Sequence, residues 1–350
     1  MHSIRIDRTK RLAHEPGLGH NRFHPDIAPI VEIGEGVEVA LETRDALDGQ
    51  LGPGTTVADF PSLDVGAVHP LTGPVFVKGA APGDILEIEF TDIIAQPVAF
   101  SAIMPGLGFL RDVMTEPFLV HWQIRDGWAT SAEIPGVRIP GGPFMGVSGV
   151  APSAEKLAEW TAREQRVIDK GGLAGLRTLP PRENGGNFDV KQLTKGSRLF
   201  LPVFTEGGLF STGDGHFAQG DGEVCVTAVE MGATAVVRFK VHKGLANRRK
   251  FTAPVFSRTS YFIDPRYAAP ERFLGVMGMP INQGGEIEAE NLTLACRNAV
   301  LNMMELLQER GFSREQAYVI CSVAVDLRIS NVVDVPNYVV SALLPEAIFD

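Results

Sequence analysis

Four ionisable side chains lie close together in a glycine-rich stretch near the middle of the chain, STGDGHFAQGDGEV (211–224). On an extended strand, residues two apart share a face, so the spacing predicts that Asp214 pairs with His216. Asp221 and Glu223 repeat the same spacing. The glycines between them would let the backbone bend and let a ligand come close. The stretch is therefore either a polar turn or a site that binds a metal or a substrate.

The residue types in this stretch suit a metal centre. Histidine together with carboxylates is a ligand set for Zn²⁺ or a related divalent ion, with one position left for water. Such an ion lowers the pKa of bound water and polarises a carbonyl group, two requirements of amide hydrolysis. A remaining carboxylate could act as general base and then protonate the leaving amine. The alternative is a decorated hairpin loop, because Asp-Gly pairs are common in hairpin turns.

A second polar group lies near the N-terminus, in GHNRFHPDIAP. His20 and His24 are four residues apart and would share a helix face, but Pro25 argues against a helix there. We therefore expect His20 and Asn21 to line a substrate loop or a contact between subunits, and not to bind a metal.

Four further residues are candidates for chemistry. Asp45 ends a predicted strand in LETRDALDGQ, where a carboxylate is usually solvated; it matters only if the fold brings it to the 211–224 stretch. His69 precedes Pro70 and suits a structural histidine better than a ligand. Asn187 and Asp189 follow a glycine pair, so their side chains could hold a carbonyl oxygen or form an Asx turn.

Catalysis by a serine or cysteine nucleophile has little support in this sequence. There is no GxSxG motif, and Cys225 lies in the apolar run VCVTAV, which favours a packed thiol. The 3 cysteines include no CxxC pair, so neither a disulfide framework nor a thiolate zinc site is expected.

Composition limits the class of protein. The 350 residues are 44% hydrophobic and 21% charged, as in an ordinary globular protein. A formal net charge of −10 disfavours nucleic acid and anionic membranes as partners. No run of apolar residues approaches the length of a membrane span, and the N-terminus has no apolar signal region. We expect a cytoplasmic protein with reduced thiols.

The elements that would position these residues are mostly strands. Glycine (38) and proline (24) interrupt short apolar runs, as in β proteins. Two strand–turn–strand units are predicted, one around residues 34–36 and one around 81–84. Helices are predicted over 153–169, as an insertion, and over 291–310, before a capping-box helix that starts at Ser313.

This order predicts a mainly β fold, with a sandwich-like or barrel-like body and an α+β C-terminal portion. We predict a β-rich region over residues 1–200 with the helical insertion near 153–169. A second, α+β region over 201–350 would carry the 211–224 stretch and be intertwined with the first.

With these segments in order, the chain resembles the acetamidase/formamidase family. The resemblance covers most of the chain, and GDGHxxQGDGE is its most specific motif; the others are HNRFHPDIAP, LETRDALDGQ, HPLTGPVFVKGAAPGDILEIEFTDI, GGNFDVKQLTKGSRLFLPVF and SVAVDLRISNVVDVPNYVVSALLP. The family implies a metal-associated hydrolase that releases ammonia from small carboxamides such as formamide or acetamide. It is distinct from the nitrilase-type amidases, which use cysteine. The segments 153–169 and 256–282 match no substrate signature and leave the preferred amide open.

Roles carried over from the resemblance are expectations. Asp45, His216 and Asp214 are expected to bind the metal; Glu223, Asp221, Asn187 and Asp189 are expected to be catalytic; His20, Asn21 and His69 are expected to line the substrate. Which acid is ligand and which is base stays open. We expect a divalent metal, zinc before calcium, a small amide substrate and a homodimer or higher homo-oligomer. The alternative is a β-rich protein that binds a metal or a small molecule without turnover.

Overall fold

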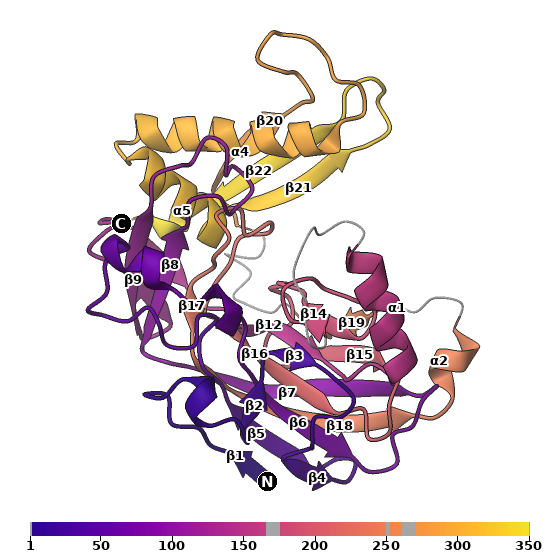
Figure 1. The fold of residues 1–350 in the computed structure, drawn as a ribbon. Coiled ribbons are helices and arrows are strands. Elements are labelled where there is room, and N and C mark those ends of the chain that lie inside the picture. The colour runs from indigo at the N-terminus through magenta and orange to yellow at the C-terminus, as the bar shows by residue number, and fades with distance from the viewer. Residues whose placement is uncertain (1, 166–175, 250–252, 261–269, 350) are drawn as a thin grey trace.

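The computed structural model describes the whole chain except residues 1, 166–175, 250–252, 261–269 and 350. Its body consists of two large β-sheets, and a smaller sheet with two helices lies above them (Figure 1). This architecture confirms the predicted mainly β fold with an α+β C-terminal portion. Among the described helices, none combines the length and the apolar composition needed to cross a bilayer.

One large sheet runs in the order β1-β5-β18-β7-β15-β19. Its longest pairing is the antiparallel one between β7 and β18. The strands are β1 (His2–Ile4), β5 (Glu38–Glu42), β7 (Ile85–Ala95), β15 (Arg198–Pro202), β18 (Ala233–His242) and β19 (Val255–Ser257).

The other large sheet runs β11-β10-β9-β8-β17-β16-β12-β14, and β6 pairs with β16, β2 and β4. Every residue of β16 is buried, because β6, β12 and β17 pair with it and the first sheet packs on it. The strands are β2 (Gly19–His20), β4 (Val31–Ile33), β6 (Leu71–Val77), β8 (Val98–Ile103), β9 (Phe118–Arg125), β10 (Trp128–Thr130), β11 (Arg138–Pro140), β12 (Phe144–Gly149), β14 (Gly185–Asn187), β16 (Phe210–His216) and β17 (Glu230–Met231).

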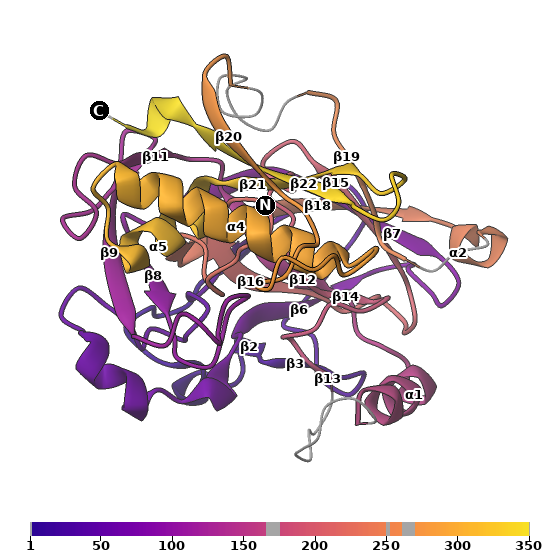
Figure 2. The ribbon, with the colours of Figure 1, turned by 90° about the horizontal axis from the view of Figure 1, so that it is seen from above.

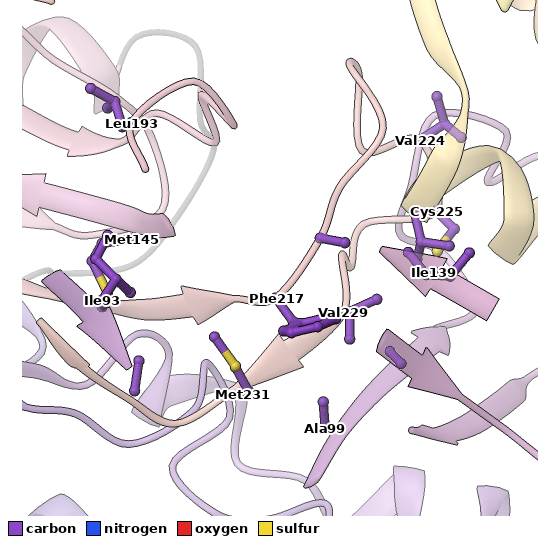
Figure 3. Packing of buried hydrophobic residues seen from close by; sticks show 14 of the residues in the cluster. Ile93, Ala99, Ile139, Met145, Leu193, Phe217, Val224, Cys225, Val229 and Met231 are labelled. Carbon is purple, nitrogen blue, oxygen red and sulfur yellow. The ribbon is translucent and has the colours of Figure 1, made fainter. Parts of the chain in front are cut away.

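The two predicted strand–turn–strand units are present, but neither is a hairpin. In each unit the first strand, β4 or β6, belongs to the sheet of β16, and the second, β5 or β7, belongs to the other sheet. The turns therefore carry the chain from one layer to the other. Phe210 on β16 and Phe239 on β18 meet edge to face between the layers, with ring centroids 5.3 Å apart. Figure 3 shows part of this core, where Phe217 lies beside Val229.

The C-terminal portion is a three-stranded sheet, β20-β22-β21, with α4 packed on it. Seen from above, α4 and α5 lie across the body (Figure 2). The predicted long helix and capping box are confirmed: Ser313 accepts from the Gln316 amide, and Gly311 follows α4 with φ +96°. The elements are β20 (Phe273–Gly278), α4 (Leu292–Glu309), α5 (Arg314–Ala324), β21 (Asp326–Asn331) and β22 (Val339–Pro345). Strands β20 and β21 were not predicted.

The remaining elements are short. The expected insertion helix is α1 (Ala154–Gln165), and residues 166–169 of that prediction lie outside the described part of the chain, as do 261–269 of the segment 256–282. Strand β15 runs across residue 200, so the predicted regions 1–200 and 201–350 share both large sheets, and the division itself stays a prediction. The other elements are β3 (Arg22–Phe23), β13 (Leu176–Arg177), α2 (Leu245–Arg248) and the 3₁₀ turns η1 (Leu12–His14), η2 (Val57–Ser62), η3 (Val65–Ala67) and η4 (Glu346–Ile348).

Candidate metal centre

Strand β16 places two of the predicted residues together in the interior. His216 ends the strand, and its Nε2 lies 3.3 Å from Asp214 Oδ1. Both residues are almost fully buried. Asp214 has a φ of +57°, a left-handed conformation that asparagine and aspartate adopt more often than other side chains. Such strain costs about 1–3 kcal/mol and is common at functional sites.

The neighbouring strand supplies a third potential ligand atom. Glu230 on β17 lies directly across from His216, and its Oε2 is 3.0 Å from His216 Nε2. Glu230 is as buried as the other two, and Asp214, His216 and Glu230 form one group able to hold a metal ion. The sequence reasoning missed Glu230. Its signal was an acidic residue inside the apolar run VCVTAVEMG, where a strand would bury it.

Two acidic residues from loops complete a second group around the same imidazole. Asp189 and Glu223 lie within reach of His216, with Glu223 Oε1 3.9 Å from Nε2. Both acids have left-handed backbone angles, φ +49° and +43°. Both are only partly buried, so this side of the centre is the more open one.

The predicted pairing of Asp221 with Glu223 on a strand is wrong. These residues lie in a turn after β16, where the left-handed angle at Glu223 ends the alternation of faces. Asp221 faces Lys191 Nζ at 3.9 Å, and its amide donates to Asp326 Oδ1 at 3.1 Å. Within the described residues, neither group of potential ligands contains Asp221.

A glycine makes room for the carboxylates. A Cβ atom on Gly146 of β12 would lie 2.6 Å from Asp214 Oδ2, 2.7 Å from Asp189 Oδ1 and 3.0 Å from His216 Cε1. Real Cβ atoms do not come that close to other heavy atoms. The carboxylates of Asp214, on β16, and Asp189, in a loop, can therefore come together only because residue 146 has no side chain.

The hydrogen bonds of Gln219 define which nitrogen of His216 carries a proton. Gln219 Nε2 donates to the Asp189 carbonyl at 2.8 Å, so its Oε1 is an acceptor. That Oε1 lies 3.0 Å from His216 Nδ1, which must then be the donor. Once the ring gives up its second proton, its lone pair is on Nε2 and points at the carboxylates, the arrangement found for metal-binding histidines.

The charges of the centre are strongly coupled. Burial opposes a charge on His216, but the carboxylates of Glu230 and Asp214 hold its pKa well above the usual value. Burial raises the pKa of Glu230 and of Asp189 to about 7, against the attraction of His216. Burial and the neighbouring Asp189 carboxylate raise the pKa of Glu223 well above its usual range. The interior thus holds more acids than its one imidazolium can neutralise.

The donor set fits a divalent cation. Bond lengths of roughly 2.0–2.2 Å to nitrogen and oxygen place tetrahedral ligand atoms about 3.3 Å apart. His216 Nε2 lies 3.3 Å from Asp214 Oδ1 and 3.0 Å from Glu230 Oε2. Glu230 Oε2 has no hydrogen-bond partner among the described residues, although it is buried. A divalent cation bound here would take the place of the proton that the imidazolium holds between Nε2 and these carboxylates.

Two more predicted residues lie next to the centre. Asn187 Nδ2 donates to Asp189 Oδ2 at 2.7 Å, so this amide holds the carboxylate instead of pointing freely at a ligand. Asn187 Oδ1 and Asp189 Oδ1 are buried and have no partner within the described chain. His69 Nε2 lies 3.9 Å from Asp214 Oδ2, and its Nδ1 is likewise buried and unpartnered there.

His20 and Asn21 take part in other contacts. Asn21 donates to the Gly66 carbonyl at 2.8 Å. His20 Nδ1 accepts from the Arg22 amide at 3.4 Å, so its Nε2 carries the proton and donates to Ser211 Oγ at 2.8 Å. Burial lowers the pKa of His20 to about 4. With its proton already on Nε2, His20 cannot take one from Ser211, which argues against a serine nucleophile here.

Asp45 belongs to neither group of potential metal ligands among the described residues. Its Oδ1 accepts from the amides of Leu47 at 2.9 Å and Gly49 at 3.2 Å, which closes the turn after β5. It lines a cavity that also reaches Glu230. Asp45 and Glu230 thus share a cavity, and a role for Asp45 as a metal ligand stays a prediction.

Together, the fold and the site define a two-layer β protein with one histidine among four buried or half-buried carboxylates. The chain belongs to the acetamidase/formamidase family, whose model matches residues 5–350.

Curated relatives match nearly end to end. The acetamidase of Mycolicibacterium smegmatis is 35% identical over 360 residues, covering 90% of this chain and 87% of the relative. The formamidase of Methylophilus methylotrophus is 32% identical over 384 residues, covering 99% and 93%.

Solved structures match as well. A gamma lactamase from Delftia acidovorans superposes with a TM-score of 0.93 at 33% identity, covering 100% of this chain and 94% of that one. An acetamidase from Bacillus halodurans gives a TM-score of 0.59 at 28% identity, covering 93% and 95%.

Proposed function

We propose that the protein is a metal-dependent amidase that hydrolyses small linear carboxamides to a carboxylate and ammonia. Membership of the acetamidase/formamidase family supports the reaction class. The observation that carries the metal dependence is the imidazole of His216, held by Gln219 so that Nε2 faces two buried carboxylates.

In this proposal the ligands are Asp214, His216 and Glu230, the fully buried group. A ring nitrogen among the ligands favours zinc over calcium, which takes oxygen ligands. When bound, such an ion polarises a carbonyl group and lowers the pKa of a water molecule. Glu230 replaces Asp45 in the ligand set expected from the sequence, because it is the acid that lies against Nε2.

Asp189 is the general base in this proposal. Its Oδ2 is held by the Asn187 amide, and its buried Oδ1 has no partner among the described residues. Oδ1 is thus the atom free to take a proton from the attacking water and to return it to the leaving nitrogen. Glu223 lies beside it and could share that proton. Overall, an amide and one water give a carboxylate and an ammonium ion, so the protons balance.

His69 is proposed to line the substrate site from the side of Asp214, where its Nδ1 has no partner among the described residues.

We also propose a homodimer or higher homo-oligomer. Light scattering that shows a monomer at assay concentration would reject the proposed oligomer.

Metal analysis combined with an amide panel tests the function. We expect about one divalent ion per chain and ammonia release from formamide, acetamide or propionamide. Chelation should abolish the release, and the same metal should restore it. His216→Ala should lose metal and activity together, whereas Asp189→Asn should keep the metal and lose turnover by about 10²–10⁴-fold. A bound ion without turnover of any amide would favour the non-catalytic alternative; full turnover without metal would reject the metal role.

One observation supports a second substrate class. The solved structure that superposes with a TM-score of 0.93 is a gamma lactamase, so a cyclic amide is a candidate substrate. Ring opening of a γ-lactam gives one amino acid and no free ammonia. Chromatography of the products from 2-pyrrolidinone, run beside the linear panel, separates the two classes.

A further inference from the structure

A cavity of about 180 Å³ lies next to the metal centre and has no role in the proposal so far. The turn after β5 forms one wall, and residues of β8, β9 and β17 form another. Glu230 and Asp45 both belong to its lining. The cavity therefore borders a residue of the centre and a second, separate carboxylate, and its volume exceeds what one water molecule needs.

The cationic side chains around this cavity already have anionic partners. Arg8 NH1 lies 3.7 Å from Glu42 Oε2, and its other nitrogens donate to carbonyl and hydroxyl oxygens. Arg44 pairs with Glu15, and its Nε lies 3.4 Å from Asp48 Oδ1. The positive charges of both arginines are thus balanced by neighbouring carboxylates.

His121, the other basic residue of the lining, is held in the same way. Its Nε2 lies 3.1 Å from the Gly52 carbonyl oxygen, and its Nδ1 lies 3.5 Å from Glu133 Oε1. None of the three basic side chains is thus left without an acceptor or an anionic partner.

In the lining, the carboxylate of Asp45 can still accept a hydrogen bond. Both amide hydrogen bonds to Asp45 end on Oδ1, and within the described part of the chain no other residue donates to Oδ2. Burial raises the pKa of Asp45 to about 6, so the carboxyl is still charged at neutral pH, in a poorly solvated place. A cavity with a spare carboxylate oxygen, whose three basic side chains already have partners, suits a small cation with N–H donors.

We propose that this cavity binds the ammonium ion released by amide hydrolysis, with Asp45 Oδ2 as its main acceptor. The inference rests on the proposed function only for the source of the ammonium. The cavity would draw the product away from the reacting atoms, past Glu230, before it reaches solvent. An acidic product would instead meet the two carboxylates and be repelled.

Product inhibition tests this proposal, with the carboxylate product measured by chromatography and ionic strength held with sodium chloride. Ammonium chloride should inhibit the holoenzyme, and Asp45→Asn should raise its inhibition constant about tenfold or more, the value of a charge-assisted hydrogen bond. Asparagine keeps an Oδ1 acceptor for the Leu47 and Gly49 amides. Acetate inhibition should change less than twofold. Asp26→Asn, at a side chain 88% exposed, is the control for net charge and should change neither constant.

Thallium(I), an ammonium-sized ion that scatters anomalously, gives a readout independent of turnover. Crystals of the metal-loaded enzyme in thallium acetate should show a peak beside Asp45 that is absent in Asp45→Asn. Ala99→Leu fills part of the cavity without changing a charge and should also remove the peak.

No peak beside Asp45, or equal ammonium inhibition in wild type and Asp45→Asn, would overturn the proposal. A peak in a protein that hydrolyses no amide would support the site and reject the proposed function instead.

Discussion

Replacing Gly146 by alanine tests the geometry of the centre with a single methyl group. The new Cβ would start 2.6 Å from Asp214 Oδ2 and 2.7 Å from Asp189 Oδ1, whereas ordinary contacts begin at 3.4 Å. The two oxygens must therefore retreat by about 0.8 Å and about 0.7 Å, beyond the tolerance of roughly 0.2 Å for metal ligands. The φ angle of Gly146 lies outside the left-handed range, so alanine strains no backbone and the effect comes from crowding alone.

We expect Gly146→Ala to weaken metal binding by about 10–100-fold and to lower kcat/KM by about 100-fold. Overpacking should cost about 1–3 kcal/mol of unfolding free energy, so the measurements are made on protein shown to be folded by circular dichroism. Competition with a chelator gives the metal affinity, and ammonia release gives kcat/KM. Gly34→Ala is the matched control, because nothing lies within 4 Å of its Cβ. Wild-type metal affinity and kcat/KM in Gly146→Ala would refute the convergence of the two carboxylates.

Three further substitutions have defined outcomes. Gln219→Leu removes the acceptor that orients the histidine ring and should weaken metal binding by about 10–100-fold, whereas Gln219→Glu should restore part of it. Lys191→Met removes the closer of two cations from the largely buried Asp326, which keeps Arg328 at 3.6 Å, and should lower the unfolding free energy by about 1–3 kcal/mol in urea titrations. Asp45→Asn should stabilise the protein at neutral pH. Because burial raises the folded pKa of Asp45 to about 6, ionisation of this acid destabilises the folded protein as the pH rises from 4 to 6. The loss in unfolding free energy is roughly 1–3 kcal/mol after allowing for the partial exposure of the side chain. Thermal melts should therefore show a gain at pH 7 that disappears near pH 4; an equal gain at both would contradict the assignment.

Local patterns predicted the parts of the structure that local chemistry determines. The capping residues located the start of α5 and the end of α4, because a cap satisfies backbone groups of its own helix. Asp214 and His216 lie together as predicted, although Asp214 has a left-handed φ of +57° where a regular strand would be extended. The strand rule failed for Asp221 and Glu223 because these residues lie in a turn, where Gly222 and Glu223 both have positive φ angles.

Residues brought in by strand register could not be predicted in this way. Glu230 meets His216 only because β17 pairs with β16 in one particular register. A shift by one residue would put the carboxylate on the other face of the sheet. Gln219 was missed for a related reason: its amide is informative only once the Asp189 carbonyl and the His216 ring are known to lie on either side of it.

Two glycines of the 211–224 stretch, Gly213 and Gly215, have a different role from the one first expected, whereas Gly222 does allow a bend, with a φ of +116°. They suggest a flexible backbone that a ligand approaches, but the molecule itself occupies that space. A Cβ on Gly215 would lie 2.8 Å from the Ala233 Cβ, in the other sheet, and one on Gly213 would lie 2.4 Å from the Pro70 carbonyl oxygen. Neither has a left-handed φ, so close packing and not conformational freedom requires glycine there. The strand that carries Asp214 and His216 is thus held in place by close packing against its neighbours. A site that must keep its ligands in fixed positions requires such support.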